Sequence, residues 1–168
     1  MRLTIRTNLA MRVLMTCAVN PGKSITKSEI AEKCNASKNH LGQVIRQLAR
    51  LGYIRAMRGR NGGMYLAMPA EEIGVGSVFR LFEADLPFAE CFDEKENNCP
   101  LIDSCWLKPA LKKAVESFYE SLDEIRLSDL VEGNEDLENM LNMPLHRGMA
   151  GMRRQDGSCI GRGGAGLN

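Results

Sequence analysis

Three cysteines stand close together in the second half of the chain. Cys91, Cys99 and Cys105 fall within fifteen residues, with seven and then five residues between them. This spacing differs from the paired CxxC of most structural zinc sites, and no histidine or fourth cysteine lies within ten residues. Three thiolates can hold a cubane iron–sulfur cluster and leave one iron with a weak or exchangeable ligand. On spacing alone, a zinc ion, redox-switch thiols and three unrelated cysteines remain alternatives.

The other cysteines and the N-terminus indicate the compartment. Residues 1–8 lack the apolar core and cleavage site of a secretory signal, and no apolar run approaches the roughly 18 residues of a spanning helix. We therefore expect a cytoplasmic protein with reduced thiols. Cys17 and Cys34 lie on apolar helix faces and are expected in the core, while Cys159 lies in a glycine-rich tail.

The N-terminal part of the chain, before the cysteine loop, has the pattern of several short helices. Apolar residues at helical spacing predict a helix over 5–19, with Ile5 as the first residue of its buried stripe. A short helix follows from Thr26 or Lys27 to residue 34. Ser37 is a favourable N-cap for a helix over 38–51. Two short helices joined by a tight turn form a helix-turn-helix.

A basic hairpin is predicted directly after this motif. Strand-like runs over 53–58 and 64–67 flank the glycine-rich turn 59–63, and such a hairpin is a wing. Further helices are predicted over 73–83 and 107–125, on either side of an acidic loop over 85–105 that carries the three cysteines.

Charge divides the 168-residue chain into unlike halves, although its net charge is only +1. Residues 1–68 hold twelve basic and two acidic side chains, whereas residues 69–146 hold six basic and eighteen acidic ones. Residues 147–168 add four basic and one acidic side chain. The +10 half predicts a nucleic-acid face, and the composition excludes both a uniformly basic histone-like protein and a wholly disordered chain.

The DNA-reading surface is expected on the second helix of the motif and on the wing. Leu41, Ile45 and Leu48 would face the core, which leaves polar side chains outward for base edges and phosphates. A module that binds only protein, with a solvated charged face, is the alternative. The predicted DNA-binding residues are Ser37, Lys38, Asn39, His40, Gln43 and Arg46 on the helix, with Gln47 also available, and Arg58, Arg60 and Asn61 in the wing.

The ordered combination of the start MRLT, the wing segment 57–63 and the three-cysteine loop resembles the Rrf2 family of winged-helix transcription regulators, over residues 1–142. The resemblance implies cytoplasmic bacterial homodimers that bind double-stranded DNA at a pseudo-palindromic operator. It also implies that the helix over 107–125 forms the dimer. An iron–sulfur cluster held by Cys91, Cys99 and Cys105 would be the sensor, of the 4Fe–4S type or else 2Fe–2S.

Two branches of the family share features with this chain. Residues 37–41 and 47–53, with the cysteine segments and residues 127–131, are similar to nitric-oxide-sensitive repressors. Residues 7–8 and the cysteine spacing are similar to iron-responsive regulators. Position 8 can carry an acidic fourth cluster ligand from the partner subunit in the first branch. Asn8 stands there in this chain, and a neutral amide is a poor iron ligand.

The resulting prediction is a mainly α protein with a small β-wing. It comprises a winged helix-turn-helix domain over 1–84, a cysteine loop over 85–106, a dimerisation helix and C-terminal element over 107–142, and a disordered tail over 143–168. The expected function is a repressor that loses its operator when nitric oxide attacks the cluster, with iron sensing as the alternative. No enzyme activity is expected: an electron carrier would need a four-thiolate motif or a cofactor fingerprint. A zinc-stabilised DNA-binding module is the third hypothesis.

Overall fold

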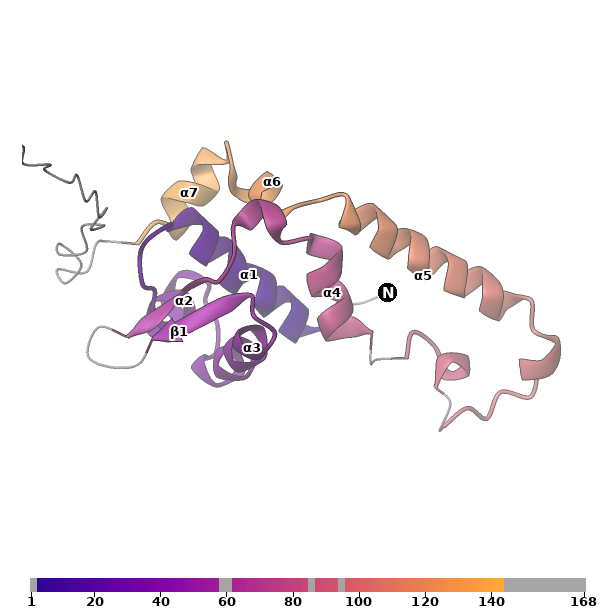
Figure 1. Ribbon diagram of the computed structural model, residues 1–168. Helices are drawn as coiled ribbons and strands as arrows, with labels where there is room; N and C mark the ends of the chain where they lie inside the picture. Colours follow the sequence, from indigo (N-terminus) through magenta and orange to yellow (C-terminus); the bar gives the residue numbers. More distant parts are fainter. Residues whose placement is uncertain (1–2, 58–61, 85–86, 94–95, 144–168) are drawn as a thin grey trace, which may run out of the picture.

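The computed structural model describes residues 3–57, 62–84, 87–93 and 96–143. The fold is mainly helical with one two-stranded antiparallel sheet, as the sequence predicts. Residues 58–61 of the wing and residues 144–168 of the predicted tail lie outside the described residues, whereas Met143, predicted as the first residue of the tail, is buried in the core. The elements are α1 (Ile5–Val19), α2 (Lys27–Lys33), α3 (Lys38–Arg50), β1 (Ile54–Met57), β2 (Gly63–Leu66), α4 (Val75–Glu83), α5 (Leu107–Asp123), α6 (Leu127–Val131) and α7 (Glu135–Leu141), as Figure 1 shows.

Short polar residues begin the first helices. The Thr4 hydroxyl caps α1 by accepting from the Thr7 N–H, and Thr26 forms a reciprocal capping box with Glu29 at the start of α2. Ser37 lies at the predicted N-cap of α3, but its side chain makes no capping hydrogen bond. Gly52 follows α3 with φ +82°, a conformation that side chains rarely adopt.

The core of the DNA-binding domain is built around α1, which packs on α3, α4, α6 and the wing. One prediction for this helix is wrong: Ile5 is 69% exposed. Ile5 lies on the same side of the helix as the buried Leu9 and Thr16, but it is the first residue of α1, where the core does not reach. The largest fully buried apolar side chains are Leu14, Ile25, Ile30, Leu41, Leu48, Ile54, Ile73 and Leu127.

The wing is tied to the start of the helix-turn-helix. Strands β1 and β2 pair from Ile54–Leu66 to Met57–Gly63. Met64 also exchanges two backbone hydrogen bonds with Ile25, of 2.9 and 2.8 Å. Because Ile25 comes directly before the Thr26 cap of α2, these bonds hold the hairpin beside the helix-turn-helix.

The chain after α5 returns to the N-terminal domain. The Leu127 N–H donates to the Ile73 carbonyl over 2.9 Å, and the Asn20 amide accepts from the Met143 N–H over 2.8 Å. Leu127 and Met143 both belong to the hydrophobic core. Residues 127–143 are therefore part of the same packed unit as α1, although the sequence grouped residues 107–142 together.

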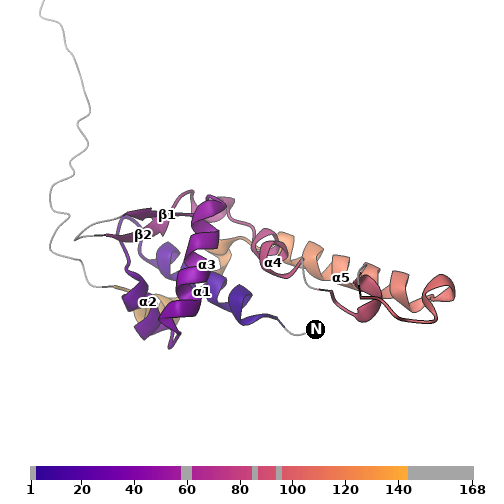
Figure 2. The same cartoon turned by 90° about the horizontal axis from the view of Figure 1, so that it is seen from below.

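Helix α5 forms an arm with the cysteine loop at its far end (Figures 1 and 2). It packs along α4, through Phe118 on Phe79 among other contacts. Within the described residues of 85–126, Tyr119 is the one side chain that is buried. The arm therefore contributes little apolar core of its own.

Candidate DNA-binding surface and cysteine loop

Helix α3 presents one apolar and one polar face, as the sequence predicts. Leu41, Val44, Ile45 and Leu48 are buried against the domain. The opposite face and the preceding cap are open to solvent, which leaves these side chains able to reach the edges of bases in a major groove. The exposed predicted DNA-binding residues are Ser37, Lys38, Asn39, His40, Gln43 and Arg46. Arg58, Arg60 and Asn61 lie outside the described residues.

Gln47 departs from the outward orientation predicted for it. Its side chain is half-buried, and its Oε1 accepts from Nη2 of Arg6 in α1 over 2.5 Å. Its Nε2 donates to the carbonyl of Leu81 in α4 over 3.3 Å. Sequence spacing missed these contacts because both partners lie more than thirty residues away. Gln47 therefore joins helices of the domain and is removed from the set of free base-reading side chains.

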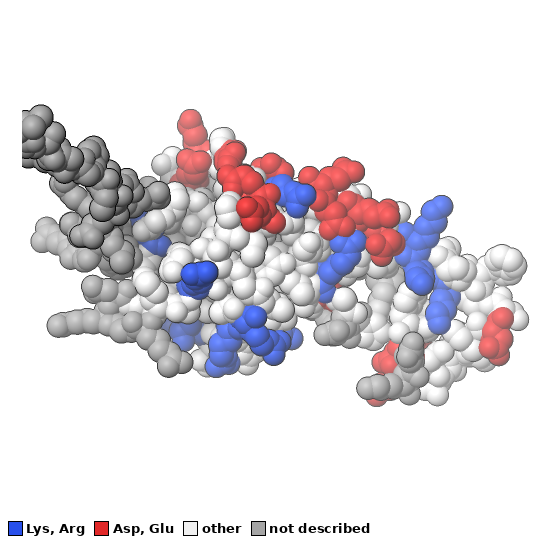
Figure 3. Space-filling view, in the orientation of Figure 1, with Lys and Arg blue, Asp and Glu red and all other residues white. Residues whose placement is uncertain are grey.

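Basic and acidic side chains lie on opposite edges of the DNA-binding domain (Figure 3). In the view of Figure 3, basic side chains gather along the lower edge over α3, and acidic side chains line the upper edge over α6, α7 and α5. The exposed basic residues of this lower edge include Lys38, Arg46 and Arg50. A polyanion would be attracted to the α3 edge and repelled from the other.

The cysteine loop is irregular and joins α4 to α5. Two 3-10 turns, Glu90–Phe92 and Ile102–Ser104, bracket its middle. The Asn98 N–H donates to a Glu90 carboxylate oxygen over 2.9 Å, and the Cys99 N–H donates to the Asn97 side chain over 3.0 Å. These bonds are local, so the loop can change shape without breaking the domain core.

The thiols of Cys91, Cys99 and Cys105 are free and half-buried. As a donor set they fit an iron–sulfur cluster, because unpaired thiols on one exposed loop can reach a cluster as thiolates. The structure does not gather them, however: among the described residues, no three His, Cys, Asp or Glu side chains lie close enough to hold a metal ion. The loop would have to close to bring the three sulfurs together.

Asn8, the predicted fourth-ligand position, is exposed in the second turn of α1. Its neighbour Thr7 is buried and donates a hydrogen bond to the carboxylate of Glu83, the last residue of α4. The structure thus places Asn8 where α1 meets the helix that leads into the cysteine loop.

Two cysteines outside the loop, Cys17 and Cys34, belong to or pack against the core. Cys17 is 3% exposed, and burial raises the pKa of its thiol to about 12. Cys34 is half-buried against the core, with its sulfur 3.9 Å from the Thr16 hydroxyl oxygen. Burial of the protonated Cys17 thiol and the packing of Cys34 on the core agree with the core role expected for both. Cys159 lies outside the described residues.

The fold and the exposed face of α3 define a winged-helix DNA-binding protein. The sequence model of Rrf2, described as an iron-dependent transcriptional regulator, matches residues 3–133. The chain belongs to the Rrf2 family. It is therefore a DNA-binding transcriptional regulator and not an enzyme. No helix in the described part of the chain is both long and apolar enough to cross a membrane.

Relatives and solved structures agree with this family. The chain is 41% identical over 144 residues to the HTH-type transcriptional regulator NsrR of Bacillus subtilis, covering 85% of this chain and 99% of that one. It is also 41% identical over 143 residues to protein aau3 of Rhizobium meliloti, covering 85% and 93%. The oxidised form of Staphylococcus aureus CymR superposes with a TM-score of 0.61 at 28% identity, covering 79% of this chain and 97% of that one. T. potens IscR gives 0.61 at 25% identity, covering 81% and 90%.

Proposed function

We propose that this protein is a homodimeric repressor in the cytoplasm that carries an iron–sulfur cluster on Cys91, Cys99 and Cys105 and releases its operator in response to nitric oxide. The observation that carries the proposal is the set of three free, half-buried thiols on a loop outside the domain core. The 41% identity to an NsrR supports the nitric-oxide branch.

Each part of the chain has a task in this proposal. When bound, the cluster would supply irons that react with nitric oxide. Cys91, Cys99 and Cys105 would hold it and close the loop around it. The exposed residues of α3 would read base edges, and the wing would meet the DNA backbone or minor groove.

A second copy of the chain would cover the exposed apolar side chains of the arm. Trp106 is 89% exposed and Leu107 is 63% exposed at the start of α5. Apolar side chains at the end of a helix with so little core favour association with an equal surface. A two-fold dimer would place two α3 helices for a pseudo-palindromic operator.

The proposal is tested by anaerobic purification followed by gel-shift titration of operator DNA. One arm receives nitric oxide and the other receives an iron chelator. Release at a nitric oxide stoichiometry close to the cluster content, with little chelator effect, supports the proposal. A colourless protein that binds DNA equally in both arms contradicts it and favours a zinc-stabilised module.

An iron-responsive regulator is the second candidate. Two observations favour it: the family is described as iron-dependent, and Asn8 stands at a position where a neutral amide binds iron poorly. A weakly held cluster would be lost when iron is scarce. In the same gel-shift experiment, release by the chelator without release by nitric oxide would establish this function instead.

A further inference from the structure

The first turn of α1 and the last turn of α4 are fastened together. The carboxylate of Glu83 accepts from the Thr4 N–H over 2.9 Å and from the Thr4 hydroxyl over 2.8 Å. It also accepts from the Thr7 hydroxyl. Arg6 lies with its guanidinium 5.9 Å from the centre of the Phe82 ring, so a cation–π contact joins the same two turns. These helix ends should therefore move as one body.

Gln47 connects this body to α3. Its amide uses both polar atoms, since Oε1 accepts from Arg6 in α1 and Nε2 donates to the Leu81 carbonyl in α4. The buried face of α3 otherwise packs through apolar side chains such as Leu41 and Leu48. Apolar contacts are non-directional, whereas the two hydrogen bonds of Gln47 fix both distance and angle.

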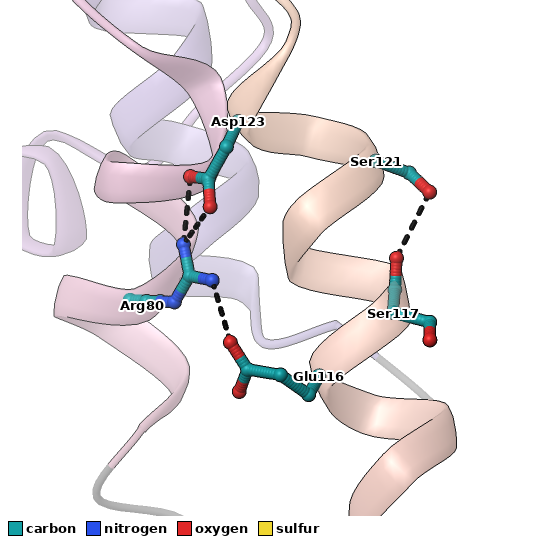
Figure 4. A network of polar contacts seen from close by, with 5 residues as sticks. All are labelled: Arg80, Glu116, Ser117, Ser121 and Asp123. Carbon is teal, nitrogen blue, oxygen red and sulfur yellow. Dashed lines mark hydrogen bonds and ion pairs between the residues drawn. The ribbon is translucent and has the colours of Figure 1, made fainter.

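The same body borders the regions proposed to sense the signal. Glu83 lies two residues before the cysteine loop begins, and Asn8 directly follows Thr7. On its other side, α4 is held to α5 by Arg80. One guanidinium nitrogen lies 2.5 Å from Asp123 and the other 3.1 Å from Glu116 (Figure 4). Because Arg80 holds α4 to α5, a change in the shape of the cysteine loop would act on the last turn of α4.

We propose that Gln47 is a positioning residue that passes the state of the cysteine loop to the DNA-reading face of α3. Gln43 lies on that face one helical turn earlier, so a shift of α3 at Gln47 re-aims the side chains that would meet bases. The inference rests on the proposed function, because it assumes that the loop controls operator binding.

The test compares Gln47→Met with Gln43→Met in the full-length protein. Methionine keeps the length and helix propensity of glutamine and removes its hydrogen bonds, so both variants are expected to fold. For each protein, operator affinity is measured with the cluster loaded and after its removal. Amide hydrogen exchange of residues 44–50 is measured in the cluster-free form.

The two variants should separate the positioning of α3 from the direct contact of its side chains with bases. Gln47→Met should lower the ratio of loaded to cluster-free affinity about five-fold or more, within the usual range of coupling between sites. It should also speed amide exchange in α3 about five-fold, the factor that corresponds to losing a hydrogen bond of about 1 kcal/mol. Gln43→Met should weaken both forms equally and leave the ratio and the exchange unchanged. Gln47→Glu, which can still accept from Arg6, should recover part of the ratio.

The outcomes distinguish this inference from the proposed function. A wild-type ratio near one would overturn both. A wild-type ratio well above one that persists in Gln47→Met would overturn the inference alone, as would an equal loss of ratio in Gln43→Met. Unchanged α3 exchange in Gln47→Met would show that the side chain does not position the helix.

Discussion

The DNA-binding domain, residues 3–84 with 127–143, and the arm, residues 85–126, differ in how they are stabilised. The domain holds nearly all buried apolar side chains of the described residues, including Leu14, Leu41 and Leu48, each 0% exposed. The arm buries Tyr119 and leaves Trp106 and Leu107 in solvent. A region with its own core resists large changes of shape, whereas a region without one takes its shape from what binds to it. This contrast suits a DNA-binding domain of stable shape joined to an arm whose shape responds to a signal.

The largest expected effect comes from the arm. Cys99→Ala should abolish the cluster and the response to nitric oxide, because two thiolates hold a cluster too weakly. Iron and sulfide content, visible absorbance and gel shifts measure this. Cys34→Ala, a free cysteine of the domain, serves as the matched control and should keep the colour. Retained colour and release in Cys99→Ala would remove Cys99 from the ligand set.

A core substitution tests the other region. Leu48→Ala should lower the free energy of unfolding by about 2–5 kcal/mol, since a fully buried leucine leaves a cavity that the domain fills only in part. Urea unfolding followed by circular dichroism measures the change. A loss below about 1 kcal/mol would mean that the domain is less tightly packed than the burial of Leu48 indicates.

Leu107→Glu tests whether the exposed start of α5 meets a second copy. An unpaired carboxylate in an apolar interface should raise the dimer dissociation constant about ten-fold or more. Sedimentation equilibrium measures the constant. Lys113→Gln, which changes the net charge equally on another exposed part of α5, should leave it nearly unchanged. Equal effects of the two variants would argue against an interface at Leu107.

Arg80→Ala tests the joint between the two regions. Its partners Glu116 and Asp123 have side chains 59% and 41% exposed, so solvent screens the ion pairs and the expected loss is about 1 kcal/mol. The loss should shrink in high salt. Urea unfolding at two salt concentrations measures both effects. A loss that did not depend on salt would assign the role of Arg80 to its packing on Tyr119 instead, where its guanidinium lies 4.8 Å from the ring centre.

The smallest effect is confined to alkaline pH. The pKa of the Cys17 thiol is raised from 9.0 to about 12 by burial, so the folded state keeps a proton that the unfolded state loses between these values. The contribution of the buried thiol to the free energy of unfolding is therefore complete below pH 9. Above pH 9 this contribution falls by about 1 kcal/mol per pH unit. The unfolding free energy of Cys17→Ala should lack this part of the slope when compared between pH 8 and pH 10. An identical slope in wild type and variant would refute the shift.

Most of the local structure could be predicted because its signals lie within a few residues. The helix over 5–19 has the observed bounds, and the helix over 107–125 ends two residues earlier, at Asp123. Periodicity and caps such as Thr26 carry this information. The exposed face of α3 followed from the same periodicity, since Leu41, Ile45 and Leu48 fix which side is buried.

The elements up to the helix over 107–125, the opposite charges of the two halves and the three-cysteine loop could all be read from the sequence, since composition and spacing are local properties. The contacts of Gln47 with Arg6 and Leu81, and the hydrogen bond that ties Met143 to Asn20 at the core, arise from the packing of the folded chain. Each of these depends on contacts between positions brought together by packing, and no period or motif records which distant partner a polar side chain will meet.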